Sequence, residues 1–483
     1  MRRHSIAASA AGILLSACQL TPPSQPIATC KIPKEVLRTA QPDEDDTGAL
    51  GDESSFQGSL RGLLTPGATV PNVSPSGLGE SARPPNLLFL SGGSQKGSFG
   101  AGFLKGWSAR PGGLPEFDLV TGVSAGSILS TAAFIGDGQG ASDRFALIDR
   151  ESKVLKPFAK RGANGDFGLS SYINIAKHGA AADLAPMRTM LIGYLTSRRA
   201  PGGPRVIDEV AERATAGKKL YVGAADLDSG EFVAFDLSEY VRGRTPDQID
   251  QAMVDCYADA IVASSSVPLA ALPVFIDGRL YVDGGARNGM FGSQLATQLY
   301  EVALARVQTP PAPAPEPAPP PPRLYLLVNG TQEMDPDCDG YKKAKIAPAG
   351  PSVALDRFCD KVVGDPRETP PGRPKWSLAT VGMRSVDVLV NQVYRSNAQS
   401  IYLNYLLAYR NRDSFHFVRM RGDSADFHYE GRSCGSSAGR MPADGAPTWY
   451  QLDDQAYRPL EFYPRFMQCL QAYGAHRAQA EGW

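Results

Sequence analysis

The sequence of 483 residues has no excess of charge of either sign. Its 49 Lys and Arg residues balance 50 Asp and Glu residues, which leaves a net charge of −1. This balance gives the chain no electrostatic drive toward nucleic acid, so we expect no such partner. The sequence also contains no CxxC motif and no internal repeat. A cysteine zinc site therefore has no support, and we expect neither a metal nor a cofactor.

Long hydrophobic segments are missing as well. The most apolar stretch near the N-terminus, Ile6 to Ala17, has twelve residues, whereas a membrane-spanning helix needs about 20. It follows Arg2 and Arg3, as is typical of a signal peptide. The stretch ends in Leu-Ser-Ala-Cys18, which resembles the signal of bacterial lipoproteins.

That resemblance implies that residues 1–17 are removed and that Cys18 carries lipid. The protein is then a lipid-anchored protein of the cell envelope, bound to the membrane through its acyl chains. Gln19 after the cysteine favours the outer membrane or a periplasm-facing position over inner-membrane retention. The alternative is an ordinary secretory signal followed by an incidental cysteine.

Six further cysteines remain after Cys18, an even number that permits disulfides in an exported protein. We expect two bridges between cysteines that are close in sequence, Cys338 with Cys359 and Cys434 with Cys469. Cys256 lies in an apolar helical pattern, so we expect it to be a buried free thiol.

Composition divides the rest of the chain into four parts. Residues 18–85 are rich in Pro, Ser, Gly and Thr without an apolar period, which predicts a disordered tether. Residues 86–308 form the expected catalytic core. Residues 309–322 are a Pro-rich insert in an extended polyproline conformation. Residues 323–483 complete the domain and add a helical extension at the C-terminus.

Short apolar runs alternate with helical patterns from residue 86 onward. Such alternation predicts an α/β fold, a three-layer α/β/α arrangement with a mainly parallel central sheet. The expected strands are 86–90, 117–123, 220–225, 231–236, 280–282, 323–328 and 415–420. The expected helices are a stretch ending near 109, then 124–135, 184–195, 206–216, 249–262, 290–307, 377–409 and 464–480.

Three motifs carry the chemistry. The first is a Gly-rich loop after the strand 86–90, with Gly92, Gly93, Ser94, Lys96 and Gly97. Glycines let a backbone turn sharply and present several N–H groups at a helix N-terminus, which suits an anion. The loop lacks the Lys-Ser/Thr of a Walker motif and the spacing of a dinucleotide-binding motif.

The second motif, Gly122-Val-Ser124-Ala-Gly126, lies between an expected strand and an expected helix. G-x-S-x-G in this context is a nucleophile elbow, whose glycines permit the tight turn that exposes the serine oxygen. The third motif, Asp283-Gly284-Gly285, places a carboxylate at the end of a strand.

Together the three motifs resemble the patatin-like phospholipases, and Ala263 to Pro268 resembles the small-residue block of that family. The resemblance covers about residues 86–330. It implies hydrolysis of acyl esters of membrane phospholipids or other lipids, with Ser124 as nucleophile and Asp283 as base, without histidine. It also implies oxyanion donors in the loop around Gly92. Ser94 stands where the family usually has a third glycine.

A free Asp, with a pKa near 3.9, is a poor base toward a serine hydroxyl. We therefore expect burial to raise the pKa of Asp283, and the loop amides to supply most of the transition-state stabilisation. Two alternatives stay open. One is a Ser-Asp-His esterase of the α/β-hydrolase type that uses His416 or His428, and the other is an inactive, lipid-anchored binding protein.

Overall fold

The computed structural model describes residues 30–38, 55–71, 82–146, 148, 151–158, 174, 178–308, 320–330, 378–435, 446–457 and 462–481. These residues build a nine-stranded sheet with the order β1-β7-β6-β3-β2-β10-β11, in which β9 pairs with β6 and β8 with β9. Its strands are β1 (Lys34–Leu37), β2 (Asn86–Leu90), β3 (Leu119–Val123), β6 (Lys219–Asp226), β7 (Phe232–Asp236), β8 (Val274–Ile276), β9 (Arg279–Asp283), β10 (Arg323–Val328) and β11 (Phe415–Arg419).

Neighbouring strands in the stretch β6-β3-β2-β10-β11 of the sheet are parallel. The pairs β1–β7, β6–β7, β6–β9 and β8–β9 are antiparallel. Two small antiparallel ribbons stand apart from the sheet: β4 (Lys156–Pro157) with β5 (Ala182–Asp183), and β12 (His428–Tyr429) with β13 (Arg432–Ser433). The expected parallel sheet is confirmed, and the antiparallel part was not expected.

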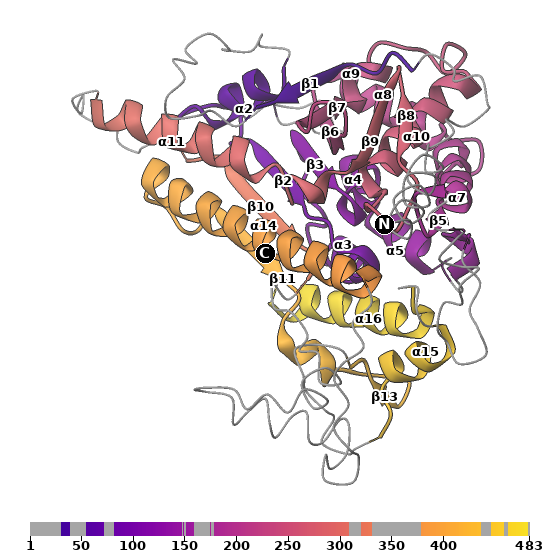
Figure 1. Cartoon of the computed structure of the whole chain (residues 1–483). Helices are drawn as coiled ribbons and strands as arrows, with labels where there is room; N and C mark the ends of the chain where they lie inside the picture. Colours follow the sequence, from indigo (N-terminus) through magenta and orange to yellow (C-terminus); the bar gives the residue numbers. More distant parts are fainter. Residues whose placement is uncertain are drawn as a thin grey trace, which may run out of the picture.

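Helices cover both faces of the sheet (Figure 1). They are α2 (Phe56–Leu64), α3 (Gly97–Ser108), α4 (Ala125–Phe134), α5 (Gly138–Ala146), α7 (Ala185–Thr196), α8 (Val206–Thr215), α9 (Leu237–Val241), α10 (Gln251–Ser265), α11 (Gly292–Gln308), α14 (Leu378–Tyr409), α15 (Trp449–Tyr457) and α16 (Pro464–Glu481). Short 3-10 turns are η1 (Ser94–Lys96), η2 (Glu151–Lys153), η3 (Gly284–Ala286) and η4 (Gly422–Ala425).

Alternate residues of the central strands explain the layers. Leu88 and Leu90 of β2 face a core shared with α3, α4, α10 and α16. Leu87 and Phe89 face a second core shared with α2, α11 and α14. A parallel strand buried on both faces reads as one continuous apolar run, which is why β2 is recognisable in the sequence. The three-layer α/β/α prediction is confirmed, with the ends of the expected elements shifted by a few residues at most.

Residues 18–85, predicted to be a disordered tether, contain two segments with regular structure among the described residues, β1 and α2. Strand β1 pairs with β7 at the edge of the sheet. Helix α2 begins at a Ser55 cap, whose hydroxyl accepts from the Gly58 N–H at 3.0 Å. Phe56, Leu60 and Leu64 of this helix are fully buried against the sheet. Tertiary contacts that no local pattern reveals therefore order these segments.

The disulfides correct one cysteine prediction and confirm another. Cys256 is bonded to Cys30, so the expectation of a free thiol is wrong. The bridge fastens the N-terminal segment to α10 across 226 positions of sequence. Cys434 is bonded to Cys469 as predicted. The expected Cys338–Cys359 pair and most of the Pro-rich insert lie outside the described residues.

The C-terminal helix belongs to the core. Glycines of α3 and α16 let the two helix backbones approach closely: a β-carbon at Gly106 would lie 2.5 Å from the Ala475 carbonyl oxygen, and one at Gly474 would overlap the Phe99 carbonyl. Because α3 follows the Gly-rich loop directly, α16 supports that loop from behind.

Candidate active site

Ser124 lies at the turn between β3 and α4, and its backbone adopts φ 53° and ψ −125°. A positive φ is unfavourable for serine, and such strain concentrates at functional sites. The turn closes because its neighbours lack side chains. A β-carbon at Gly122 would lie 2.5 Å from the Gly126 carbonyl oxygen, and one at Gly126 would overlap the Leu90 carbonyl. The side chain of Ser124 is 5% exposed.

Strand β6 brings Asp283 to this serine. Its first half pairs with β3, where Val123 lies opposite Gly223. From Ala224 onward it pairs with β9, where Asp283 lies opposite Ala224. The last residue of β3 and the last residue of β9 thus face consecutive positions of one strand. This register places Ser124 and Asp283 side by side, and the Ser124 hydroxyl is close enough to lower the pKa of the Asp283 carboxyl.

The environment of the carboxyl adjusts its basicity. Burial raises the pKa of Asp283 from its usual value near 3.8 to about 6, although the hydrogen bond with Ser124 and the Gly285 N–H oppose the rise. The Gly285 amide donates to Oδ1 at 2.7 Å. Near pH 7 the carboxyl is mostly ionised, yet it is far more basic than a free aspartate.

The small-residue block at the end of α10 positions both groups. The Ser264 hydroxyl accepts from the Ser124 N–H at 2.9 Å and donates to the Gly223 carbonyl at 2.6 Å. The Ser266 carbonyl accepts from the Asp283 N–H at 2.9 Å. Ser264 and Ser266 are fully buried. Small hydroxyl residues at this point can satisfy backbone groups that larger side chains would displace.

The Gly-rich loop leaves β2, passes through η1 and enters α3. Gly93 has φ 155° and Ser94 has φ 49°, so the serine takes the left-handed conformation that a glycine would adopt without strain. The Gly92 N–H points to the Gly289 carbonyl at 3.4 Å. The amides of Gly93 and Ser94 donate to no acceptor within the described part of the chain. These two N–H groups are therefore the open donors of the loop.

Lys96 and Gly97 end the motif at the start of α3. The Lys96 N–H donates to the Gly93 carbonyl at 3.0 Å and closes the turn. A β-carbon at Gly97 would lie 2.6 Å from the Ala125 β-carbon. Gly97 thus lets α3 and α4 begin side by side, which aligns the loop with the nucleophile turn. In the third motif, Gly284 allows the same close approach to the Gly223 carbonyl, at 2.5 Å.

This geometry agrees with the comparisons. Residues 88–291 match the family described as patatin-like phospholipase. They form a patatin-like phospholipase domain. The family is one of lipid acyl hydrolases, and the match contains all three sequence motifs. No curated protein matches the chain.

Solved structures are also similar to the chain. One of them is the crystal structure of VipD from Legionella pneumophila, which is 15% identical and covers 85% of this chain and 71% of its own. The TM-score is 0.30.

The two histidines of the Ser-Asp-His alternative lie on elements other than those of Ser124 and Asp283. His416 lies on β11, where it pairs with Tyr325 of β10 and stacks on its ring at 4.5 Å. Strands β10 and β2 lie between β11 and the nucleophile strand β3. His428 lies on the separate β12–β13 ribbon, with its ring bonded to the Asp426 carbonyl at 2.9 Å. These positions of His416 and His428 therefore do not support the Ser-Asp-His alternative.

Asn329 directly follows β10, and the sequence analysis did not predict that it belongs to the site. Its side chain donates to the Ser91 carbonyl at 2.7 Å, and its N–H donates to the Ser91 hydroxyl at 2.9 Å. A β-carbon on Gly93 would overlap the Asn329 carbonyl. Asn329 thus fixes the start of the Gly-rich loop. A polar residue directly after a buried parallel strand is the signal that could have indicated it.

Two further observations concern ions and membranes. Among the residues that the structure describes, no group of three His, Cys, Asp or Glu side chains could hold a metal ion. None of the helices in the described ranges is both long and apolar enough to cross a bilayer. Cys18, the expected lipidation site, lies outside those ranges.

Proposed function

We propose that this protein hydrolyses acyl esters of membrane phospholipids or related lipids, with Ser124 as nucleophile and Asp283 as its base. The family match supports the reaction class. The observation that carries the proposal is the pair itself. A buried carboxyl with a pKa of about 6 lies beside a serine with positive φ at a strand–helix turn, and its described interactions include no histidine.

The reaction needs two steps, and in each step Asp283 accepts one proton and gives it up again. In the first, Ser124 Oγ bonds to the acyl carbon, its proton passes to Asp283, and the leaving alcohol takes that proton as its ester bond breaks. In the second, Asp283 removes a proton from water, whose oxygen attacks the acyl-enzyme. The fatty acid leaves as Ser124 recovers its proton.

Negative charge develops on the carbonyl oxygen in both steps. The open amides of Gly93 and Ser94 are the donors that we assign to this oxyanion. The N-terminus of α4, which begins at Ala125, adds a favourable dipole directly after the nucleophile. Losing one such donor slows other serine hydrolases by about 10²–10³-fold, so the loop is central to the proposed catalysis.

A fluorophosphonate probe and defined vesicles test this function. We expect the intact protein to be labelled at Ser124 and to release fatty acid from phosphatidylcholine–phosphatidylglycerol vesicles. The matched Ser124→Ala protein should do neither. Lipidomics of the treated vesicles then identifies the position of cleavage and the preferred headgroup. If the folded wild-type protein is neither labelled nor active, the result would favour a binding protein that has this fold but no catalytic activity.

We propose in addition that Cys18 carries a lipid anchor and holds the domain at the membrane of the cell envelope. The Cys30–Cys256 bridge supports a short connection, because residue 30 is only twelve positions after Cys18. Twelve extended residues span about 40 Å, so the anchored domain would stay near the surface that supplies its substrate. Incorporation of an alkyne fatty acid into the wild type, and its loss in Cys18→Ala, would support the anchor. Equal incorporation would contradict it.

A further inference from the structure

Helix α14 brings a tyrosine from far along the chain to the nucleophile. The helix lies alongside α11 in front of the sheet (Figure 1). A β-carbon placed on Gly92 would overlap the Tyr394 hydroxyl and lie 3.0 Å from the Ser124 β-carbon. The tyrosine hydroxyl and the nucleophile thus border the same small volume at the start of the oxyanion loop.

The carboxyl borders the tyrosine on its other side. A β-carbon on Gly285 would lie 2.9 Å from the Tyr394 hydroxyl and 3.0 Å from Asp283 Oδ1. The hydroxyl therefore lies between the oxyanion loop and the Asp-Gly-Gly turn. This position is next to both proposed reacting groups, Ser124 and Asp283.

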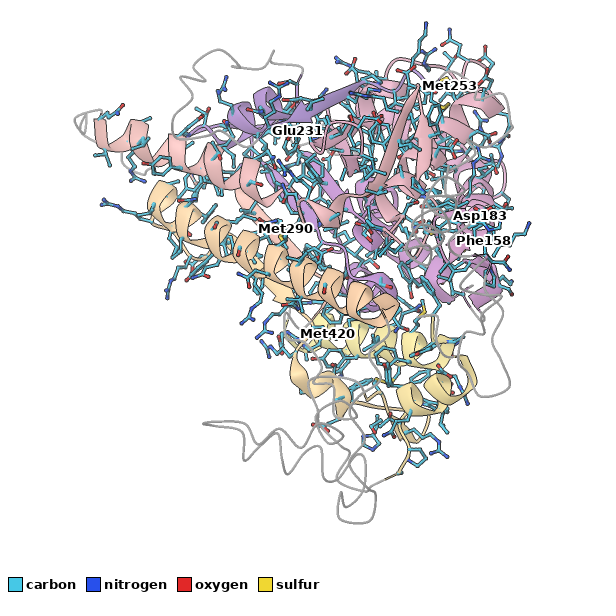
Figure 2. The ribbon with its side chains drawn as sticks, in the orientation of Figure 1. Phe158, Asp183, Glu231, Met253, Met290 and Met420 are labelled. Carbon is cyan, nitrogen blue, oxygen red and sulfur yellow. A yellow bond between two sulfur atoms is a disulfide. The ribbon has the colours of Figure 1, made fainter. Side chains whose placement is uncertain are left out.

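The position of the tyrosine is built into the fold. Its ring rests on Gly289, where a β-carbon would overlap the ring. One helical turn later, the Asn397 side chain donates to Asn288 Oδ1 at 2.6 Å, and its β-carbon occupies the space above Gly292. Met290, labelled in Figure 2, is fully buried in the core that α14 covers. These contacts hold α14 against the segment that follows Asp283.

The hydroxyl stays protonated in this position. The ring of Tyr394 is partly buried, and burial of its hydroxyl raises the pKa well above the usual value. The negative charge of Asp283 raises that pKa further. A neutral tyrosine hydroxyl can donate a hydrogen bond over the whole physiological pH range.

We propose that Tyr394 is a further catalytic residue, whose hydroxyl donates a hydrogen bond to the carbonyl oxygen of the bound ester as that oxygen becomes an oxyanion. The inference rests on the acyl-hydrolase function proposed above. Tyr394 keeps its proton throughout, because Asp283 takes the serine proton and returns it to the leaving group. The tyrosine then acts together with the Gly93 and Ser94 amides, while the Gly92 amide is directed to Gly289.

The test compares Tyr394→Phe with Tyr405→Phe in the full chain. Each variant removes one tyrosine hydroxyl from α14, but the Tyr405 hydroxyl donates to the Pro322 carbonyl at 2.8 Å, away from the site. With a soluble p-nitrophenyl ester, we expect kcat of Tyr394→Phe to fall on the order of 100-fold. KM should stay close to that of the wild type, and so should the acidic limb of the pH profile. Tyr405→Phe should keep the wild-type kcat.

Several results would overturn the proposal. A Tyr394→Phe protein with wild-type kcat would show that the hydroxyl only packs there. An increase in kcat, in this variant or in Tyr394→Ala, would identify the side chain as an obstruction of the site. A shifted acidic limb would mean that the tyrosine acts by changing Asp283 alone.

Thermal unfolding and fluorophosphonate labelling of Ser124 show whether the Tyr394→Phe site is intact. A folded, labelled variant with reduced kcat supports the proposal. If the proposed function is wrong, the result is different, because the wild type itself would then neither hydrolyse esters nor be labelled by the fluorophosphonate. That outcome overturns both proposals.

Discussion

Two regions of the chain contribute to the site in different ways. Residues 88–291, which match the patatin-like family, include Ser124, Asp283 and the Gly-rich loop, the groups that we propose to react. The later region, 320–481, lies outside that match but supplies strands β10 and β11, the loop anchor Asn329 and helix α14. Reacting groups in the first region thus depend on the second for their surroundings. The matched residues contain the proposed reacting groups, whereas the later region completes the sheet and packs α14 against α11.

The largest expected effect is that of Asp283→Asn, which should change the rate of hydrolysis and the stability of the fold in opposite directions. We expect Asp283→Asn to lower hydrolysis by more than about 10³-fold, because no base remains for Ser124. The same change removes a buried charge, so the free energy of unfolding near pH 7.5 should rise by on the order of 2 kcal/mol.

The sign follows from the raised pKa of the carboxyl. The folded state holds its proton more tightly than the unfolded state, so this contribution is full at low pH and is lost as pH rises through about 6. The stability gain of Asp283→Asn should therefore disappear near pH 3.5. Urea unfolding at both pH values measures it, and a gain that does not change with pH would contradict the assignment.

The next effect concerns the N-terminal segment, which lies outside the matched region. Phe56 of α2 is 1% exposed and packs against Tyr221 with ring centroids 4.9 Å apart. We expect Phe56→Ala to lower the free energy of unfolding by about 3–4 kcal/mol. Phe417→Ala, at a side chain that is 38% exposed, should cost much less. Equal losses in urea titrations would mean that α2 is not part of the core.

The two disulfides among the described residues allow a further comparison of the regions. Cys30–Cys256 closes a loop of 226 positions, and Cys434–Cys469 closes one of 35. Longer loops lose more unfolded-state entropy when closed, so we expect the paired Cys30→Ser/Cys256→Ser variant to lose about 2–4 kcal/mol. The paired Cys434→Ser/Cys469→Ser variant should lose less. The opposite order in chemical denaturation would show that native contacts outweigh loop length.

The smallest effect tests the oxyanion loop. Ser94 adopts φ 49°, so Ser94→Gly should relieve strain and stabilise the protein by up to about 1 kcal/mol with activity retained. Gly93→Ala should do the reverse, since its β-carbon would overlap the Asn329 carbonyl. Differential scanning calorimetry and kcat on a soluble ester measure both changes. Loss of activity in Ser94→Gly would show that the hydroxyl has a role of its own.

Much of the fold is predictable because its central strands are continuous apolar runs. The run of β2, for example, is buried on both faces, and glycines mark the turns that follow β2 and β3. The prediction failed where local composition is weak. Strand β1 and helix α2 lie in a polar, breaker-rich stretch and are ordered by pairing with β7, by the Cys30–Cys256 bridge and by burial of Phe56.

The residues of the candidate site also fall into those that the sequence indicates and those that it does not. Ser124, Asp283 and the loop glycines can be proposed from the sequence, because the chemistry inferred for them requires a particular local sequence. Tyr394 is not, because an aromatic residue in a long helix has the same pattern whether it packs in a core or faces a site. Only the pairing of β9 with β6 and the packing of α14 on Gly289 bring these residues together.

The central claim is that Asp283 activates Ser124 without a histidine. The most direct measurement is the rate of fluorophosphonate labelling of Ser124 between pH 4.5 and 8.5, in the wild type and in Asp283→Asn. We expect the wild-type rate to rise with pH through a midpoint at about 6 and then to level off, since the carboxyl must be ionised. Labelling of Asp283→Asn should be slow and nearly independent of pH. Equally fast labelling of both proteins would contradict the account.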